Sequence, residues 1–297
     1  MDDKARLGLN VGTRTKLARE CPYCGANANH LFSRFHRGYL KCSGCQLVFS
    51  EVSINHSEAY VGYSDTYDRE WRGEGREGIY SEVLNMLHDH HRELIDVGCG
   101  GGKFLVMAEG MGKVSWGVEL GMNDGAWAYE SVRSQIFESL EAMPKDLKVD
   151  VVTLVNVLDQ VPQPWDMLAS IKEKLREGGM VVIRIPNFTV HGSIHRLAAM
   201  MPDKIARRIM ALSVMHQFAF GREALNRIFD DQGYTHIRYF VSVSSQGDAY
   251  NQGLFYQLGK RVMVPLAKLI SALSMQRFLI APSILVVAEK GKVKRNG

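Results

Sequence analysis

The residues best suited to do chemistry lie in one short segment, where an acid precedes three alternating glycines. Asp96 is followed by Gly98, Gly100 and Gly102. Glycine is needed where the backbone takes left-handed torsions and approaches a ligand closely. The N–H groups at the start of a following helix favour a polar or anionic ligand group. The segment Glu93–Phe104 is therefore predicted to be a strand, a tight turn and a helix that together bind a cofactor.

The spacing of this segment distinguishes between cofactors. A dinucleotide fingerprint requires G-x-G-x-x-G, and Lys103 stands where its third glycine would be. Asp96 suits a positively charged ligand group, such as an amino-acid ammonium, and would be unfavourable beside a pyrophosphate. Glu119 ends the next expected strand, where a carboxylate can accept hydrogen bonds from ribose hydroxyls. These residues predict an adenosyl amino acid as the cofactor. The alternative is a glycine-rich turn of another α/β protein.

Four of the five cysteines form two C-x-x-C pairs near the N-terminus: Cys21 and Cys24, then Cys42 and Cys45. Their spacing lies in the range of four-cysteine zinc sites, in which the thiolates fill the tetrahedral shell and the metal is structural. Iron in place of zinc, or a knuckle without metal, is the alternative. The fifth cysteine, Cys99, lies inside the glycine segment.

The loop FSRFHRGYLK between the two cysteine pairs mixes aromatic residues with Arg34, Arg37 and Lys41. Such mixtures can bind nucleic acid. However, the chain has 36 basic and 32 acidic residues, and a net charge of +4 is too balanced to indicate a nucleic-acid protein. We expect a ribbon with a solvated face, with RNA docking as the alternative. His30 and His36 are expected to be ordinary ribbon residues.

The elements that must position these residues alternate between short apolar runs and helical patterns over residues 93–290, which predicts βαβ units and a parallel sheet. Strands are expected at Leu94–Val97, Val114–Val118, Val149–Val155, Met180–Ile185, Thr235–Val243 and Ser283–Val287. Helices are expected at Lys103–Gly110, Asp124–Arg133, Pro164–Glu177, with Gly178-Gly179 as its stop, and Arg222–Gln232. The remaining regions are a leader and ribbon at 1–50, a connector at 51–92 that ends in a cofactor-covering helix at about Gly78–His90, and a basic tail at 291–297.

Two insertions interrupt the alternation, at residues 188–220 and 246–282. The first follows the fifth strand at the sheet edge where α/β proteins bind ligands, and its methionines offer adaptable apolar surface. We expect a substrate lid, with local helical packing as the alternative. The second has leucines at helical spacing among basic residues. We favour packing on the sheet, and a peripheral membrane contact through 254–283 or a dimer contact stays open.

No stretch reaches the roughly 18 apolar residues of a membrane span, and the first ten residues contain no apolar run typical of a secretory signal. We therefore expect a cytoplasmic protein.

Three motifs carry a resemblance to a known family. DVGCGGGKF, followed by GVEL, resembles the first two motifs of class I S-adenosylmethionine-dependent methyltransferases. VDVVTLVNVLDQVPQPWDMLASIKEKLREGGMVVIRIPN resembles the family's fourth strand, fourth helix and fifth strand, and HQFAFGREALNRIFDDQGY a later helix of its zinc-ribbon-bearing branch. The resemblance covers roughly residues 20–290. It implies a Rossmann-like α/β fold: a doubly wound, mostly parallel seven-stranded sheet with an N-terminal zinc ribbon and helical lid insertions.

The resemblance also assigns expected roles. Asp96 and the glycine run, including Cys99, would contact the methionine part and the sugar of S-adenosylmethionine. Glu119 would hold the ribose, Leu120 would pack beside the adenine, and Leu140 would lie on the loop that flanks the adenine. Asn156 would face the sulfonium at the end of the fourth strand.

The same resemblance implies that the connector, which contains Tyr63 and Tyr67, folds over the cofactor. It also places a histidine at position 216. His216 is therefore the leading candidate for a base or orienting group, ahead of His191 and His195 in the same insertion.

One departure from the family bears on the chemistry. Ubiquinone-pathway O-methyltransferases and many other relatives have an acid followed by histidine after the fourth strand, whereas here the pair is Asp159-Gln160. Glutamine cannot act as a general base near neutral pH, so we expect no histidine base at this spot, and metal-assisted O-methylation is in doubt.

The leading hypothesis is methyl transfer to a small molecule or to a glycan- or lipid-linked precursor. Oxygen is the favoured acceptor atom, with carbon and nitrogen open. The sequence NVLD, in place of N-P-P-[FY], disfavours amino methylation of DNA bases. An RNA methyltransferase that docks RNA through the ribbon, and a non-catalytic scaffold with this fold, are the alternatives.

Overall fold

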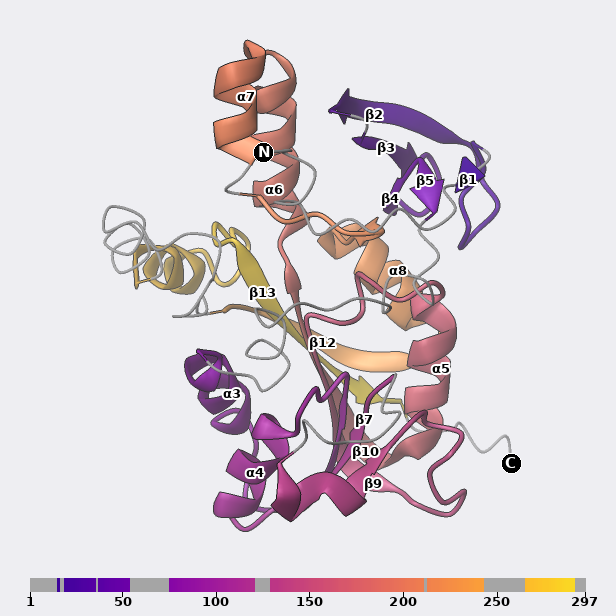
Figure 1. Ribbon diagram of the computed structural model, residues 1–297, viewed down its shortest axis with the longest axis vertical. Coiled ribbons are helices and arrows are strands. Elements are labelled where there is room, and N and C mark those ends of the chain that lie inside the picture. The colour runs from indigo at the N-terminus through magenta and orange to yellow at the C-terminus, as the bar shows by residue number, and fades with distance from the viewer. Residues whose placement is uncertain are drawn as a thin grey trace, which may run out of the picture.

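The structure is a computed structural model that describes residues 15–16, 19–35, 37–53, 75–120, 129–210, 213–242 and 265–291 (Figure 1). Tyr63 and Tyr67, the two tyrosines expected over the cofactor, lie outside these residues. The described chain forms an α/β domain joined to a small β-sheet module that contains the four paired cysteines.

A seven-stranded sheet with the order β12-β13-β10-β9-β6-β7-β8 runs through the α/β domain. Its strands are β6 (Glu93–Val97), β7 (Val114–Val118), β8 (Ile136–Phe137), β9 (Val149–Val155), β10 (Leu175–Pro186), β12 (Tyr234–Val241) and β13 (Ser283–Lys290). β13 runs antiparallel to the other six strands of this sheet, which are parallel to one another. The central strands are aliphatic and buried on both faces, as strands covered by helices must be. The expected doubly wound sheet is therefore confirmed.

The strand order reverses between β6 and β9. The chain continues from β6 through β7 to β8 on one side and from β9 to β10 on the other, and the carboxyl ends of β6 and β9 lie side by side. Open α/β sheets bind ligands in the crevice at such a reversal. Asp96 on β6 and Asn156 after β9 are both brought to this point.

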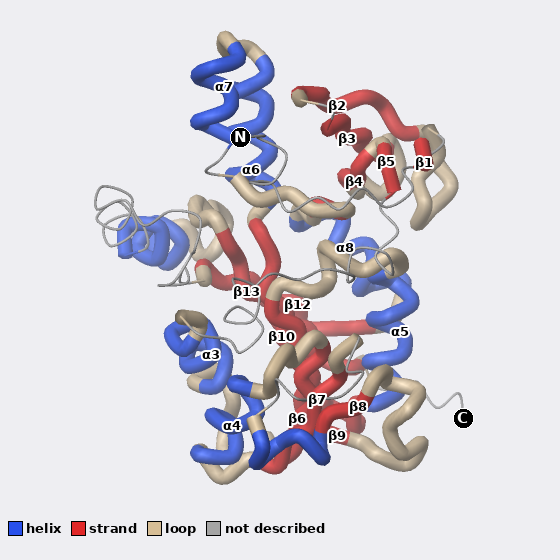
Figure 2. The backbone as a smooth tube through the Cα atoms, viewed as in Figure 1, coloured by secondary structure: helices blue, strands red, loops and turns tan. Residues whose placement is uncertain are grey.

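Helices cover both faces of the sheet (Figure 2). One face packs against α3 (Glu77–Leu84), α4 (Lys103–Gly110) and the 3-10 helix η2 (Glu130–Gln135), and the other against α5 (Pro164–Lys174) and α8 (Arg222–Asp231). Alternate residues of β9 take part in the two cores, because successive side chains of a strand point to opposite faces: Val151 and Val155 lie in one core, and Val152 and Leu154 in the other.

The N-terminal module is a four-stranded sheet of order β11-β4-β3-β2. Three strands come from the cysteine region: β2 (Ala28–Arg34), β3 (Arg37–Cys42) and β4 (Val48–Ser50). The fourth, β11 (Phe218–Ala219), belongs to the insertion 188–220 and pairs antiparallel with β4. A separate two-stranded pair joins β1 (Thr15–Lys16) to β5 (Val52–Ser53). The ribbon and the α/β domain thus share a sheet, and their buried side chains form one continuous core.

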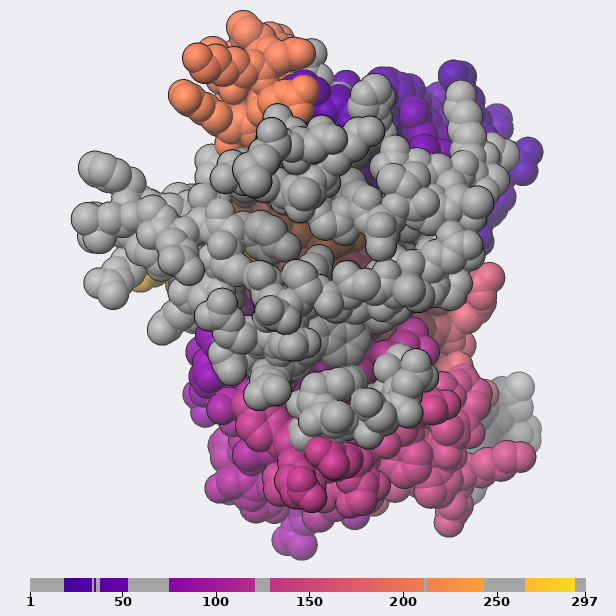
Figure 3. Space-filling view, viewed as in Figure 1, coloured from indigo at the N-terminus to yellow at the C-terminus, as the bar shows by residue number. Residues whose placement is uncertain are grey.

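The first insertion adds α6 (Phe188–Ala199) and α7 (Asp203–Met210), which adjoin the ribbon at one end of the molecule (Figures 1 and 3). The Arg207 guanidinium lies 4.2 Å from the centre of the Phe35 ring at the tip of the ribbon hairpin. The insertion therefore bridges the ribbon and the sheet.

The second insertion is described only from residue 265 onward, where residues 265–273 form a helix. Ala267 packs against Val241 of β12, and the leucines at 266, 269 and 273 are exposed. The described helices include none that is both long and apolar enough to span a bilayer.

The structure corrects several expected boundaries. α5 ends at Lys174, and Gly178-Gly179 is not its stop but part of a bulge in β10, between the pairs Leu175↔Val149 and Met180↔Val151. The connector helix ends at Leu84 rather than near His90. The expected helix 124–133 lies partly outside the described residues, and its described end belongs to η2. The expected strands missed β8, because two residues are too few to show an alternation.

The shared core predicts that the ribbon and the α/β domain unfold together. Phe49 of β4 is fully buried and pairs with Phe218. We expect Phe49→Ala to reduce the free energy of unfolding by about 3–5 kcal/mol. Circular dichroism of the helices would follow the α/β domain, and metal release to a chromophoric chelator would follow a metal-loaded ribbon. Both transitions should move together. The exposed control Met111→Ala should change stability by less than about 0.5 kcal/mol. A shift of the ribbon signal alone would contradict a shared core.

Candidate cofactor and catalytic site

The turn between β6 and α4 has a backbone that requires glycine. Gly98, Gly100 and Gly102 have φ angles of +74°, +54° and +86°. A Cβ on Gly98 would overlap Val157 Cγ2, and a Cβ on Gly102 would lie 2.6 Å from Val132 Cγ2. The Gly98 N–H donates to the Val118 carbonyl at 2.7 Å, which ties the turn to the end of β7. The expected strand, turn and helix are therefore present, and the side chains of Val157 and Val132 pack directly against Gly98 and Gly102.

Two buried acids flank this turn. Asp96 and Glu119 are 3% and 7% exposed. Thr153 Oγ1 donates to Asp96 Oδ1 at 2.6 Å, and the Gly100 N–H donates to Glu119 Oε2 at 2.7 Å. Glu119 thereby links the end of β7 to the glycine turn. Thr153 is not among the residues predicted for the site, although a hydroxyl within the apolar run VDVVTLV is a signal for it.

Both carboxyl groups have pKa values well above the usual range. Burial raises the pKa of Asp96 to about 7, against the Thr153 hydrogen bond, and the charge of Glu119 adds to the increase. Burial also raises the pKa of Glu119 to about 7, against backbone hydrogen bonds from Gly100 and Leu120. Each carboxyl group has a higher pKa in the folded protein than in the unfolded chain. The free energy of unfolding therefore falls as the pH rises from about 4 to about 7, because the acids ionise less readily in the folded protein. A cationic or hydrogen-bond-donating ligand would relieve this cost.

The other expected cofactor residues lie around the same turn. Leu120 follows Glu119 and is about half exposed, whereas Leu140 is buried in the core. The Cys99 side chain is buried and packs near Gly117, so a contact from Cys99 to a ligand in the turn would come from its backbone.

Asn156 marks the carboxyl end of β9 and has a φ angle of +60°, which is uncommon for a residue other than glycine. Its side-chain Oδ1 accepts a hydrogen bond from the buried Arg184 guanidinium, and its carbonyl accepts one from Gln160 Nε2 at 2.6 Å. Arg184 also donates to Ser242 Oγ at 3.0 Å. The strained Asn156 backbone is thus held by its neighbours. Arg184 is not among the predicted residues either, and its signal is a charged residue within the apolar run VVIRIP.

The structure brings His216 to Asp159. His216 Nε2 lies 3.8 Å from Asp159 Oδ2, and the His216 side chain is 36% exposed whereas that of Asp159 is 3% exposed. Among the described residues, neither Asp159 oxygen has a hydrogen-bond partner, and burial raises the pKa of this carboxyl against the effect of His216. Position 160 is a glutamine, and the histidine beside Asp159 comes from position 216 through tertiary folding.

His191 has a structural role. Its Nε2 donates to the Pro282 carbonyl at 2.8 Å, and its Nδ1 accepts from the Val214 N–H at 3.2 Å. Burial lowers the pKa of His191, so the ring is neutral and joins α6 to the segment that precedes His216. His195 is buried against the rings of Phe32 and Tyr39 in the ribbon, with centroid distances of 5.3 and 6.2 Å. Neither histidine approaches Asp159 in the way that His216 does.

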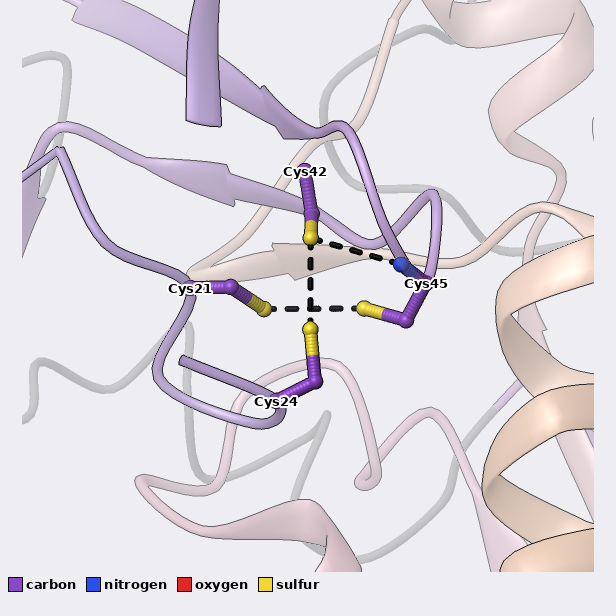
Figure 4. A group of neighbouring side chains, drawn as sticks. All are labelled: Cys21, Cys24, Cys42 and Cys45. Atoms are coloured by element: carbon purple, nitrogen blue, oxygen red, sulfur yellow. Dashed lines mark hydrogen bonds between the residues drawn. The ribbon is translucent and has the colours of Figure 1, made fainter. Parts of the chain in front are cut away.

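The four ribbon cysteines converge on one point (Figure 4). Their sulfurs all lie within 4.8 Å of one another, with 3.5 Å between Cys21 and Cys45 and 3.4 Å between Cys24 and Cys42. A tetrahedral zinc with bonds of about 2.3 Å separates its sulfur ligands by roughly 3.8 Å. The N–H groups of Gly44 and Cys45 point at Cys42 Sγ, at 3.3 and 3.4 Å. The donor set and its spacing therefore fit a zinc ribbon.

Comparison with known proteins places this geometry in a family. The Methyltransferase domain family matches residues 69–239, which is more than half of the chain. The chain belongs to this family. Its class I methyltransferase fold and its cysteine ribbon agree with the resemblance found in the sequence.

Two curated relatives are similar over part of their length. The ubiquinone biosynthesis O-methyltransferase of Glaesserella parasuis is 26% identical over 110 residues, which cover 33% of this chain and 47% of the relative. The mitochondrial ubiquinone biosynthesis O-methyltransferase of Schizosaccharomyces pombe is 29% identical over 155 residues, which cover 44% of this chain and 55% of the relative. The chain thus spans about half the length of the curated relatives it matches.

A solved structure supports the fold. A S-adenosylmethionine-dependent methyltransferase from Archaeoglobus fulgidus matches with a TM-score of 0.50 at 17% identity, covering 77% of this chain and all of that one. At this identity the likeness concerns the fold alone.

The glycine turn can be tested by its steric requirement. Gly98→Ala should reduce the free energy of unfolding by about 2 kcal/mol, because it places a Cβ at positive φ and against Val157. The matched control is Gly110→Ala at the end of α4, where a Cβ meets open space. This variant should be neutral or more stable by up to about 1 kcal/mol. Chemical denaturation measures both, and equal effects would contradict the described turn.

Proposed function

We propose that this protein transfers a methyl group from S-adenosylmethionine to an oxygen of a small molecule or of a glycan- or lipid-linked precursor. The observation that carries the proposal is the pair of buried acids on either side of the glycine turn, at the reversal of the strand order. Burying two carboxylates without a cation costs free energy. An adenosyl amino acid offers an ammonium group to one acid and hydroxyl donors to the other.

The two acids would bind different parts of the cofactor. The cofactor ammonium would lie against Asp96 and convert it to the ionised form, and the ribose hydroxyls would donate to Glu119, which already accepts from Gly100. The methionine part would lie along the glycine turn, Leu120 and Leu140 would flank the adenine, and Asn156 would face the sulfonium. Tyr63 and Tyr67 would cover the cofactor from the connector. S-adenosylmethionine supplies an activated methyl group when bound.

His216 is proposed as the general base. Methyl transfer from a sulfonium needs alignment and exclusion of water, and it needs a base only when the acceptor must lose a proton. His216 is partly exposed near the carboxyl-terminal ends of the strands. Its Nε2 faces the buried Asp159 carboxylate. This carboxylate would orient the ring and stabilise the imidazolium that forms, so the pair suits removal of a hydroxyl proton. The insertion 188–220 would cover the acceptor as a lid.

The cysteine cluster is proposed to hold a structural zinc ion. Four thiolates close the coordination shell, so the metal would not take part in methyl transfer. The names of the two curated relatives support oxygen as the acceptor atom and a small molecule as the substrate class. The leucines exposed on the helix 265–273 suit a peripheral membrane contact, which we propose for a lipid-linked acceptor.

Cofactor binding tests the first part of the proposal. Calorimetry with S-adenosylhomocysteine, which keeps the ammonium and the ribose, should show binding to the wild type, and Asp96→Asn should weaken it by about 10- to 150-fold. Because Asp96 must lose its proton to pair with the ammonium, the affinity should fall about tenfold per pH unit below about 7 and level off above it. Glu130→Gln, whose side chain is 92% exposed, is the control. A wild-type protein without affinity for this ligand would reject the proposal.

Turnover tests the base. Candidate acceptors can be screened in a small-molecule extract with a methyl-labelled cofactor, while total RNA serves as the arm for the RNA alternative. With the acceptor found, His216→Gln should reduce kcat by about 10²- to 10⁴-fold with little change in cofactor affinity, and Asp159→Asn should reduce it in the same direction. Label in RNA rather than in small molecules would favour ribbon docking. Tight cofactor binding without any labelled product would favour the scaffold alternative.

A further inference from the structure

The segment that carries His216 lies between the ribbon and the α/β domain. On the ribbon side, the Tyr39 hydroxyl donates a hydrogen bond shared between the carbonyls of Met215, at 3.1 Å, and His216, at 3.0 Å. The Ser50 N–H donates to the Gln217 carbonyl at 2.9 Å, and β11 then pairs with β4. Three consecutive carbonyls, at residues 215 to 217, are therefore held by ribbon groups.

The α/β domain holds the same segment from the other side. The Phe218 N–H donates to the Asp159 carbonyl at 3.0 Å, so the residue that carries the carboxylate is tied to the segment that carries the histidine. The Phe218 ring meets Trp165 of α5 edge-on at 5.7 Å, and the Val214 N–H donates to His191. The backbone on either side of His216 is thus fixed, while its side chain projects toward Asp159.

The cysteine cluster sets the geometry of the ribbon strands that make these contacts. β3 and β4 pair in the register Tyr39↔Ser50, which places both groups that hold the segment opposite each other. The turn between these strands is closed by the second knuckle, where the N–H groups of Gly44 and Cys45 point at Cys42 Sγ. The Cys42 N–H donates to the Leu47 carbonyl at 2.9 Å. A metal held by this knuckle would therefore fix the register of Tyr39 and Ser50.

We propose that the metal ribbon is a positioning element of the catalytic site and that Tyr39 is its positioning residue, holding the backbone of residues 215–216 so that the His216 imidazole faces Asp159. The inference rests on the proposed function, because it assigns the ribbon to the proposed base. Tyr39 is 3% exposed and stands between the Phe32 ring and the insertion, so this ribbon face is occupied by the chain itself. In this role the ribbon positions a residue of the catalytic site of its own chain.

The chain offers a matched pair of tyrosines for the test. Both Tyr39 and Tyr23 belong to the ribbon and reach the α/β domain or its insertion, but the Tyr23 hydroxyl donates to Asp231 Oδ2 at 2.7 Å, on α8. Tyr39→Phe and Tyr23→Phe each remove one hydroxyl and leave the ring in place. The readout is the His216 ring signal in NMR spectra of the full-length, metal-loaded protein labelled with ¹³C-histidine, assigned by its loss in His216→Gln.

Tyr39→Phe should shift and broaden the His216 signal in the same direction as Asp159→Asn, while Tyr23→Phe leaves it in place. Metal content should stay at one per four cysteines, and affinity for S-adenosylhomocysteine should stay within about twofold of the wild type, because the glycine turn is not touched. An unchanged His216 signal in Tyr39→Phe would overturn the proposal. So would equal shifts in both variants, since these would report a general loosening of the ribbon.

Metal removal gives a second test that needs no substitution. After chelation of the metal from the full-length protein, amide exchange at residues 28–50 and 213–220 should accelerate together by about tenfold or more, while residues 93–104 stay protected. Continued protection of 213–220 after the ribbon opens would overturn the inference. These outcomes do not depend on the methyl donor. Failure of the wild type to bind S-adenosylhomocysteine rejects the proposed function, and the exchange and NMR results separately decide whether the ribbon positions His216.

Discussion

The burial of two carboxyl groups around a glycine-rich turn is the constraint on which the rest of the structure depends. The turn bonds Glu119 through the Gly100 N–H, and Gly98, Gly100 and Gly102 take left-handed torsions that other residues adopt at a cost. Burial raises both pKa values to about 7, against the hydrogen bonds that Asp96 accepts from Thr153 and that Glu119 accepts from backbone N–H groups. The reversal of the strand order and the helices on both faces of the sheet keep water away from the two acids. A charged ligand group would therefore interact strongly with them.

Much of this arrangement could be predicted from the sequence, because its signals are local. The glycine turn, the acids beside it and the C-x-x-C pairs each lie within a few residues, and their spacing is diagnostic of geometry. The predicted bounds of β7 and β9 agree with the structure, because both are short, mostly apolar runs flanked by polar residues. Gly178-Gly179 was misassigned because a glycine pair after a helical pattern is a common helix end, and only the pairing of Leu175 with β9 shows the bulge.

The pairing of His216 with Asp159 could not be found in this way. The two residues are far apart in sequence, and neither has a neighbour that indicates the other; their approach follows from Phe218, whose N–H bonds to the Asp159 carbonyl and whose strand completes the ribbon. The ribbon was likewise recognised from its cysteines, but its place in the fold was not. A boundary at residue 50 describes the sequence, whereas in the fold β11 extends the ribbon sheet by pairing with β4.

This sharing has a consequence for how the protein can be divided or recombined. β4 would be an edge strand of the ribbon if β11 were absent, with unpaired backbone groups beside buried Val48 and Phe49. Exposed apolar edges of this kind recruit other chains and aggregate. The ribbon is therefore not a portable module. A chimera that exchanges residues 1–50 between relatives would need to carry the partner strand from the middle of the chain with it, so the two segments are expected to change together during evolution.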